Sequence, residues 1–131
     1  MHIKIIDLLT KVAETSREHQ KLACAIVHKK RILAFGINSD KTDPFQSNFS
    51  DRAERIYKHA EIDAIKRAHN KFGKEILKHC TLYVVRIKRP YVRSKQWIWG
   101  MARPCSGCMK AIEEYNIRKV IYTTDSGYEK L

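Results

Sequence analysis

Hydrophobic residues recur along this chain at regular spacings, and the spacing predicts where its helices lie. Three segments carry apolar residues three or four positions apart, which gives each segment one apolar stripe and predicts an amphipathic helix. The first segment is residues 3–19, the second is 59–72, and the third opens at Cys105 and continues through Tyr115. Gly73 follows the second segment directly, and a glycine in that place indicates the end of a helix.

Short apolar runs between these segments predict a β-sheet. The runs are residues 22–27, 31–37, 81–87 and 119–123. The first two flank a polar turn and predict a hairpin, whereas 81–87 is β-branched and aromatic throughout, as in a central strand. A helix separates 81–87 from 119–123, so we expect these two strands to pair in parallel through a right-handed crossover. The predicted fold class is α/β, with a mixed sheet of four to five strands and helices on both sides.

Length and composition are those of an ordinary globular protein. A chain of 131 residues, 44% of them hydrophobic, can bury its own core, so we expect a single domain spanning residues 1–131. No apolar run approaches the length of a membrane span, and Lys4 and Asp7 interrupt the apolar start of the chain, which argues against a secretory signal. We therefore expect a cytoplasmic protein with no membrane partner. The formal charge of +12 favours anionic partners, from a small nucleotide to a nucleic acid strand.

Two short stretches carry the residue types of a catalytic zinc site. They are His59-Ala60-Glu61 and Pro104-Cys105-Ser106-Gly107-Cys108. One His and two Cys supply three protein ligands, the number that a catalytic zinc uses while its fourth position stays open for water. Glu61 is then left over as a carboxylate that can move protons. The combination predicts a hydrolytic zinc centre.

Both stretches fall in the first turns of predicted helices, a position that suits metal ligands. Cys105 and Cys108 are three residues apart, so their sulfurs share one helix face, and Pro104 precedes them where a missing N–H costs little. The unpaired amides of a helix N-terminus also favour the thiolate, the form of cysteine that binds metal. The alternative is a closed zinc clip that only joins two helices. The lack of a fourth soft ligand at a comparable spacing and the nearby Glu61 favour the catalytic interpretation.

The two other cysteines give weaker signals. Cys24 lies in an apolar predicted strand and is interpreted as a core residue. Cys80 follows His79, which would suit a second metal site, but no further ligands stand in register with this pair. Four cysteines, two of them at ligand spacing, do not indicate a disulfide framework.

The order His-x-Glu followed by Pro-Cys-x-x-Cys resembles the signature of the zinc-dependent cytidine, deoxycytidylate and tRNA-adenosine deaminases. The resemblance covers about residues 22–123 and is strongest to the deoxycytidylate branch. It implies a three-layer α/β/α cytidine-deaminase-like fold and a Zn²⁺ cofactor held by His59, Cys105 and Cys108. It also implies that Glu61 transfers protons during catalysis.

Three substrate-binding residues and an oligomer follow from the resemblance alone. In these enzymes an Asn in Gly-x-Asn contacts the substrate's sugar, a role that would fall to Asn38; the alternative is an Asn that only caps a turn. Backbone groups at Ala60 and near Pro104 would hold the base. Relatives are commonly multimers, and only residues 125–131 follow the last predicted strand. We therefore expect a fifth strand or closing helix to be missing, and a homo-oligomer to cover the exposed edge.

A long polar segment, residues 39–58, leads into His59. Polar segments of this length in compact domains are usually functional or disordered. Because this segment leads into His59, we expect it to form one wall of the substrate pocket. Its candidate contacts to a substrate phosphate are Lys41, Gln46 and Arg52.

A second unusual segment, at about residues 88–103, is an insertion relative to the family. It is rich in Lys and Arg, contains no acidic residue, and interleaves these cations with Tyr91, Trp97 and Trp99. Cations among aromatic rings suit single-stranded nucleic acid. A β-hairpin whose two Trp pack on the body of the protein or on a partner subunit suits the pattern equally well.

Three functions are consistent with these features. The resemblance favours hydrolytic deamination of a free cytosine nucleotide, deoxycytidylate (dCMP) to deoxyuridylate (dUMP) with release of ammonia. The insertion and the charge favour a deaminase acting on cytosine or adenine within single-stranded DNA or RNA. The third function is a catalytically silent zinc protein that binds nucleotides or nucleic acid, and the intact Glu61 argues against it.

Overall fold

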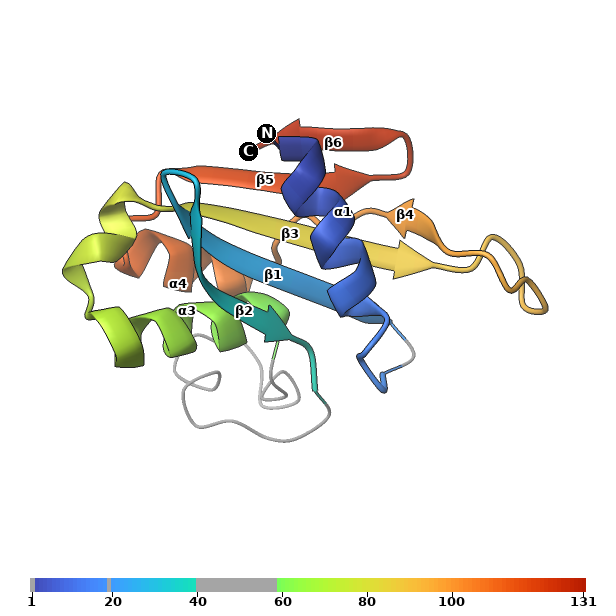
Figure 1. Cartoon of the computed structure of the whole chain (residues 1–131), viewed down its shortest axis with the longest axis horizontal. Coiled ribbons are helices and arrows are strands. Elements are labelled where there is room, and N and C mark those ends of the chain that lie inside the picture. Colours follow the sequence, from blue (N-terminus) through green and yellow to red (C-terminus); the bar gives the residue numbers. More distant parts are fainter. Residues whose placement is uncertain (1, 19, 40–58) are drawn as a thin grey trace.

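The computed structural model describes residues 2–18, 20–39 and 59–131, which form one mixed sheet with helices on both faces (Figure 1). The sheet has six strands in the order β2-β1-β3-β5-β6, with β4 paired to β3. The strands are β1 (Lys21–His28), β2 (Arg31–Ile37), β3 (Thr81–Lys88), β4 (Ile98–Gly100), β5 (Lys119–Thr124) and β6 (Gly127–Lys130). The helices are α1 (His2–Ala13), α3 (Ala60–Phe72), the 3-10 helix η2 (Glu75–His79) and α4 (Ser106–Glu114). The predicted α/β class is confirmed.

β3 lies at the centre of the sheet, as its composition predicts. It pairs antiparallel with β1 along Thr81–Ile87 and parallel with β5 along Thr81–Val84. The predicted antiparallel hairpin of β1 and β2 and the predicted parallel pair are both confirmed. β1 pairs with almost the full length of one edge of β3. On the opposite edge, β5 pairs with Thr81–Val84 and β4 pairs with Arg86–Lys88.

The sheet is wider than the four to five strands predicted, because β4 and β6 are additional. β6 pairs antiparallel with β5 through a tight turn in which the Ser126 N–H donates to Thr124 Oγ1 at 3.2 Å. The expectation that a closing strand would be missing after β5 is therefore wrong. β4 lies within the segment 88–103 and folds back on β3, which is the hairpin alternative for that segment.

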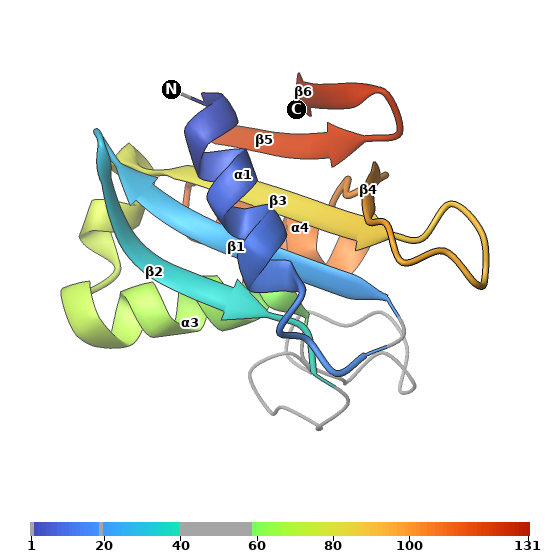
Figure 2. The same cartoon turned by 45° about the vertical axis from the view of Figure 1, so that its right-hand side comes forward.

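Two hydrophobic clusters lie on opposite faces of the sheet. In β3, Leu82 and Val84 belong to the cluster beneath α3 and α4, whereas Tyr83 and Val85 belong to the cluster beneath α1. Successive residues of a strand point to opposite faces, so this strand is buried on both sides. Figures 1 and 2 show α1 crossing one face and α3 and α4 on the other, which is the predicted three-layer arrangement.

The first helix ends at Ala13, earlier than the predicted residue 19. Beyond it the chain turns, with the Ser16 N–H donating to the Ala13 carbonyl at 3.0 Å. Ser16 is 2% exposed, and its hydroxyl donates to Asn38 Oδ1 at 2.8 Å. This bond to a distant side chain holds the turn in place of another helical turn. Neither α1 nor any other helix in the described part of the chain is long and apolar enough to cross a membrane.

The two Trp of residues 88–103 pack on the body of the protein. Both contact the cluster beneath α1, and the Trp99 indole N–H donates to Thr10 Oγ1 of that helix at 3.0 Å. Trp99 is therefore used in packing. Tyr91 of the same segment is instead 68% exposed.

Candidate active site

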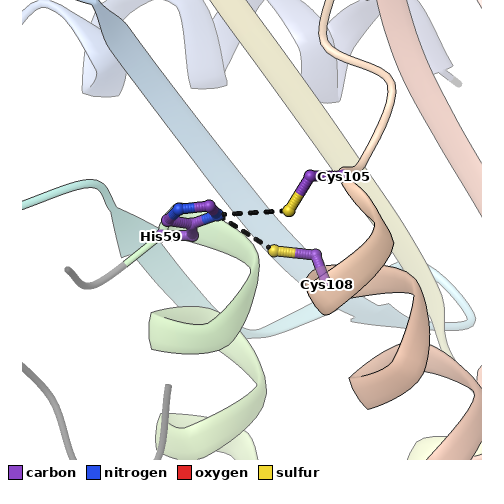
Figure 3. A group of neighbouring side chains, drawn as sticks. All are labelled: His59, Cys105 and Cys108. Atoms are coloured by element: carbon purple, nitrogen blue, oxygen red, sulfur yellow. Dashed lines mark hydrogen bonds between the residues drawn. The ribbon is translucent and has the colours of Figure 1, made fainter. Parts of the chain in front are cut away.

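His59, Cys105 and Cys108 come together where two helices begin. His59 directly precedes α3, Cys105 directly precedes α4, and Cys108 lies in the first turn of α4. His59 Nδ1 is 3.2 Å from Cys108 Sγ and 3.6 Å from Cys105 Sγ (Figure 3). The three ligand atoms all lie within 4.8 Å of one another. Two motifs far apart in the sequence thus form one cluster.

This spacing fits a single tetrahedral zinc ion. With Zn–N of about 2.1 Å and Zn–S of about 2.3 Å, ligand atoms at tetrahedral angles lie about 3.6 Å apart. The distances from His59 Nδ1 to the two sulfurs, 3.2 and 3.6 Å, are close to that value. Among the described residues, His59, Cys105 and Cys108 form the only group of three or more metal-binding side chains that lie close enough to share an ion. Three ligands leave one position open, which suits a catalytic zinc rather than a closed structural one.

A hydrogen bond between the two thiols makes their acidities unequal. The bond from Cys108 lowers the pKa of the Cys105 thiol to about 3, an effect that His59 supports and burial opposes. The same bond, together with burial, raises the pKa of Cys108 well above its usual value. One thiolate is therefore available at neutral pH, and a bound cation would favour loss of the second proton.

Glu61 lies beside this cluster, in the first turn of α3, and is 4% exposed. Burial raises the pKa of its carboxyl group, although a hydrogen bond from its own backbone, the charge of His59 and a bond to Cys108 partly oppose the shift. A carboxyl group with a raised pKa gives up and takes back a proton more readily at neutral pH. Glu61 is thus suited to proton transfer next to the metal ligands.

A glycine and a buried aspartate hold the start of α3 against β2. A Cβ at Gly36 would lie 2.3 Å from the Ala60 carbonyl oxygen, so only glycine permits this approach of strand and helix. Asp63 is 3% exposed and accepts a hydrogen bond from the Ile37 N–H at 3.1 Å. These contacts fix the first turn of α3, which carries Glu61.

A pocket of about 250 Å³ opens onto His59, Glu61 and Cys105. Its described lining is completed by Gln20, Leu22, Asn38, Ala60, Arg86, Met101, Ala102 and Arg103. The structure therefore brings two of the three predicted substrate-binding residues, Asn38 and Ala60, to the pocket. Pro104 is buried and is not part of this lining, although its neighbours Arg103 and Cys105 are. The predicted phosphate contacts Lys41, Gln46 and Arg52 lie outside the described residues.

Asn38 has structural partners as well as a place in the pocket. Its Oδ1 accepts hydrogen bonds from the Ser16 hydroxyl at 2.8 Å and the Leu22 N–H at 3.1 Å. Its Nδ2 donates to the Gln20 carbonyl at 2.6 Å. That bond uses one of two N–H groups, so the second can donate to a sugar hydroxyl. The predicted sugar contact at Asn38 stays a prediction.

Arg86 and Arg103 are pocket residues that the sequence interpretation missed. A signal for Arg86 was present in the alternation of β3. Leu82 and Val84 face α3 and α4, so Arg86 continues the same row toward the end of the strand, where the apolar positions give way to a cation. Arg103 stands directly before Pro104 in the second motif, but nothing in the spacing indicates that it lines the pocket.

The other cysteines lie apart from this cluster. Cys24 is fully buried in the core beneath α3 and α4, as predicted. Cys80 is 3% exposed and its thiol donates to the Ile76 carbonyl at 3.3 Å. No second metal-binding group that includes Cys80 and His79 occurs within residues 2–18, 20–39 and 59–131.

Fold and site together define the class of protein, an α/β/α metalloprotein with a His-Cys-Cys site and a spare glutamate at two helix N-termini. The family described as the cytidine and deoxycytidylate deaminase zinc-binding region matches residues 1–124. The chain belongs to this zinc-binding deaminase family, which confirms the predicted family and the zinc cofactor.

Solved structures share the fold at low sequence identity. A cytidine deaminase from Burkholderia pseudomallei has a TM-score of 0.70 and 15% identity, over 100% of this chain and 91% of that one. A dCMP deaminase from the cyanophage S-TIM5, in complex with dCMP and dUMP, has a TM-score of 0.52 and 22% identity, over 94% and 78%. A tRNA:A34 deaminase, which performs A-to-I editing at the wobble position, has a TM-score of 0.54 and 21% identity, over 93% and 73%. A search of curated proteins found no match.

Proposed function

We propose that this protein catalyses the zinc-dependent hydrolytic deamination of the cytosine base of a nucleotide, with dCMP as the first candidate substrate and dUMP and ammonia as products. The observation that carries the proposal is the buried Glu61 carboxyl group lining the same pocket as the metal ligands His59 and Cys105. A zinc clip that only joins two helices would need no such carboxyl group and no pocket.

The chemistry divides between the metal and the side chains around it. A zinc ion with an open position makes water nucleophilic at neutral pH, because it lowers the pKa of water from 15.7 to about 7. Glu61 would accept a proton from the attacking water and deliver it to ring N3 while the water oxygen bonds to C4. Glu61 would then carry the remaining proton from the hydroxyl group on C4 to the C4 amino group, so that the C4–N bond breaks, ammonia leaves and the C4 carbonyl of uracil forms. His59, Cys105 and Cys108 hold the ion and do not exchange protons with the substrate.

The remaining pocket residues would orient the nucleotide. We assign the backbone of Ala60 and the segment at Pro104 to the base, and the second N–H of Asn38 to the sugar. Arg86 and Arg103 place two cations at the pocket, where a guanidinium can bind a 5′-phosphate through charge-assisted hydrogen bonds. Two guanidinium groups at this place favour a nucleotide as the substrate over a nucleoside, which carries no phosphate. The homo-oligomer stays a prediction, which analytical ultracentrifugation would test.

A second candidate is deamination of cytosine within a single strand. The observation that favours it is a hollow lined with cations and aromatic rings that adjoins the pocket. A strand threaded through the pocket would extend into this hollow, whereas a mononucleotide would not.

The proposal is tested by replacing Glu61 with glutamine, which keeps the size of the side chain and removes its acid-base function. We expect Glu61→Gln to retain one zinc per chain and to lower kcat for dCMP by about 10² to 10⁴-fold, the usual contribution of a general acid-base residue. Glu113→Gln, the same change at an exposed position of α4, is the matched control and should leave kcat unchanged.

Two results would contradict the proposal. A Glu61→Gln variant with the rate of the original protein would remove Glu61 from the reaction. A zinc-loaded original protein without turnover of any cytosine nucleotide, free or in a strand, would favour the catalytically silent zinc protein.

A further inference from the structure

We call the pocket at His59, Glu61 and Cys105 the catalytic pocket. A second, larger hollow lies at the end of β3. Its volume is about 520 Å³, and it shares Gln20 and Arg86 with the catalytic pocket. We call it the basic groove and define it by Lys21, Arg86, Lys88, Arg89, Tyr91 and Trp97. Because two residues line both hollows, a ligand in one can continue into the other.

The basic groove carries more positive than negative charge. Glu18 is the carboxylate in its described lining, against four cations. Lys88 is already paired with Asp125 at 3.0 Å. Two other cations are held over an aromatic ring, since the Arg89 guanidinium lies 4.8 Å and Lys21 Nζ 5.9 Å from the centre of the Trp97 ring. Trp97 thus orients two charges at the groove without neutralising them.

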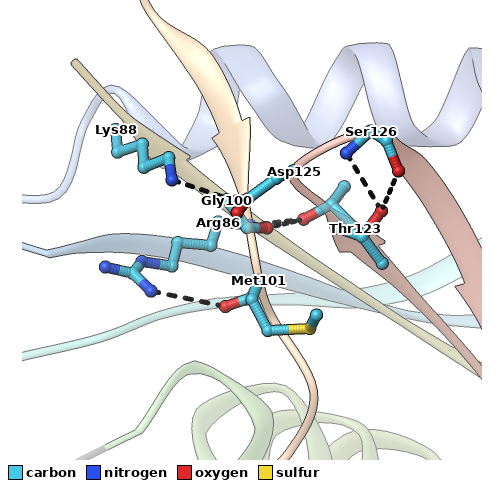
Figure 4. A network of polar contacts seen from close by, with 8 residues as sticks. Arg86, Lys88, Gly100, Met101, Thr123, Asp125 and Ser126 are labelled. Carbon is cyan, nitrogen blue, oxygen red and sulfur yellow. Dashed lines mark hydrogen bonds and ion pairs between the residues drawn. The ribbon is translucent and has the colours of Figure 1, made fainter. Parts of the chain in front are cut away.

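Arg86 stands at the junction of the two hollows. Its guanidinium reaches the Met101 carbonyl at 3.5 Å, and its Nε is buried and has no hydrogen-bond partner among the described residues (Figure 4). No ion pair joins Arg86 to a carboxylate in the described part of the chain, whereas Lys88 two residues later has one. Arg86 lines both hollows, and a phosphate is the anion whose geometry best suits a guanidinium.

An exposed aromatic ring completes the groove. Tyr91 is 68% exposed and lines the hollow beside Arg89. Its neighbour Val92 is 92% exposed, so this loop presents apolar surface to solvent rather than to the core. Stacking of a base on an exposed ring, next to cations that bind the backbone, is how proteins hold single strands.

We propose that the basic groove binds the nucleotide next to the target cytosine in a single-stranded polynucleotide. The inference rests on the proposed deamination of cytosine and, between its two candidate substrates, assigns the single strand rather than free dCMP. The phosphate that joins the two nucleotides binds Arg86, and the neighbouring base stacks on Tyr91 with its own phosphate near Arg89 and Lys21. A free dCMP fills the catalytic pocket alone, so it reacts without the affinity that the groove adds.

The test compares two substrates on one enzyme. The specificity constant kcat/KM is measured for dCMP and for a trinucleotide with a central cytosine, in deoxyribose and ribose forms that distinguish DNA from RNA. We expect the preferred trinucleotide to exceed dCMP by about tenfold or more, the usual effect of one stacked base. An enzyme that prefers dCMP to both trinucleotides would overturn the proposal.

A double variant assigns the preference to the groove. Arg89→Ala with Tyr91→Ala should lower the trinucleotide-to-dCMP ratio of kcat/KM by about tenfold, because it removes a ring and a charge from the groove. Arg93→Ala is the matched control, since Arg93 is an exposed cation of the same loop outside the groove lining and its loss should leave the ratio unchanged. Equal ratios in the original protein and the double variant would contradict the proposal, as would an equal fall in the Arg93→Ala control.

A binding measurement separates failure of the groove from failure of the proposed function. Fluorescence anisotropy of a labelled cytosine-containing octanucleotide needs no turnover. Binding that weakens with salt and is lost in the double variant, with its thermal unfolding unchanged, supports the groove even if the protein deaminates nothing. Absence of binding at low salt, in an enzyme that still converts dCMP, overturns the groove and leaves the proposed function intact.

Discussion

The catalytic pocket and the basic groove meet at Arg86, yet they are built in opposite ways. The pocket takes its chemical groups from the starts of two helices, where Glu61 is 4% exposed and Cys108 is fully buried. The groove takes its groups from strand ends and a loop, where Tyr91 is 68% exposed. Bond-making chemistry needs a few groups fixed in a dry site, whereas binding a charged chain needs long side chains that solvent and ligand can reach. Changes in the two regions should therefore have effects of different kinds.

The largest effect is expected from removing a metal ligand. Cys108→Ser should reduce bound zinc from one per chain to almost none and abolish turnover of every substrate, because a serine oxygen is a poor zinc ligand here and His59 and Cys105 alone supply only two ligands. Zinc is measured by atomic spectroscopy after dialysis. A Cys108→Ser protein that kept its zinc would exclude Cys108 as a ligand.

Substituting alanine at Gly36 and at Gly100 compares how well the pocket and the groove tolerate an added methyl group. Gly36→Ala places a Cβ 2.3 Å from a backbone oxygen of α3, whereas Gly100→Ala meets only the side-chain stems of Arg86 and Lys88, both at 3.3 Å. We expect Gly36→Ala to lower the free energy of unfolding by about 1 to 3 kcal/mol, and Gly100→Ala to lower it by about 1 kcal/mol or less. Urea denaturation of both variants measures the difference.

The outcome for Gly36 also bears on catalysis. The strain falls on the turn that carries Glu61, so folded Gly36→Ala protein should convert dCMP more slowly than the original protein. Equal losses of stability in the two glycine variants would show that the backbones of β2 and α3 move apart as easily as the side chains of Arg86 and Lys88. The pocket would then be no more rigid than the groove.

The smallest effect is expected at Cys80, one of the two cysteines that lie outside both regions. Cys80→Ser keeps a hydrogen-bond donor near the Ile76 carbonyl, and Cys80 lies in no metal-binding group of the described chain. Zinc content and kcat should stay unchanged within error. Loss of half of the zinc in this variant would reveal a second site and contradict the assignment of a single metal centre.

The pocket was largely predictable from the sequence because its groups lie in short local motifs. His59 and Glu61 are two residues apart, and Cys105 and Cys108 are three apart, so each pair stays close in space because it is close in the sequence. The central strand and its parallel partner were equally predictable, since both are continuous apolar runs.

The features that were not predicted depend on distant partners. The end of α1 is set by a hydrogen bond from Ser16 to Asn38, which lies 22 residues further along the chain. The alternation of β3 indicates that Arg86 shares a face with Leu82 and Val84, but the helices that cover that face and form the pocket lie elsewhere in the chain. Such contacts join residues far apart in the sequence, so spacing along the chain does not indicate them.

Hydrolytic deamination at a zinc site transfers the oxygen atom of water to the base, and this transfer can be measured. The zinc-loaded protein is incubated with dCMP, and separately with a cytosine-containing strand, in water enriched in oxygen-18. We expect one ammonia released for each uracil formed and one oxygen-18 atom at C4 of that uracil. A protein that binds one zinc and both ligands yet forms no labelled uracil would contradict the proposed deamination.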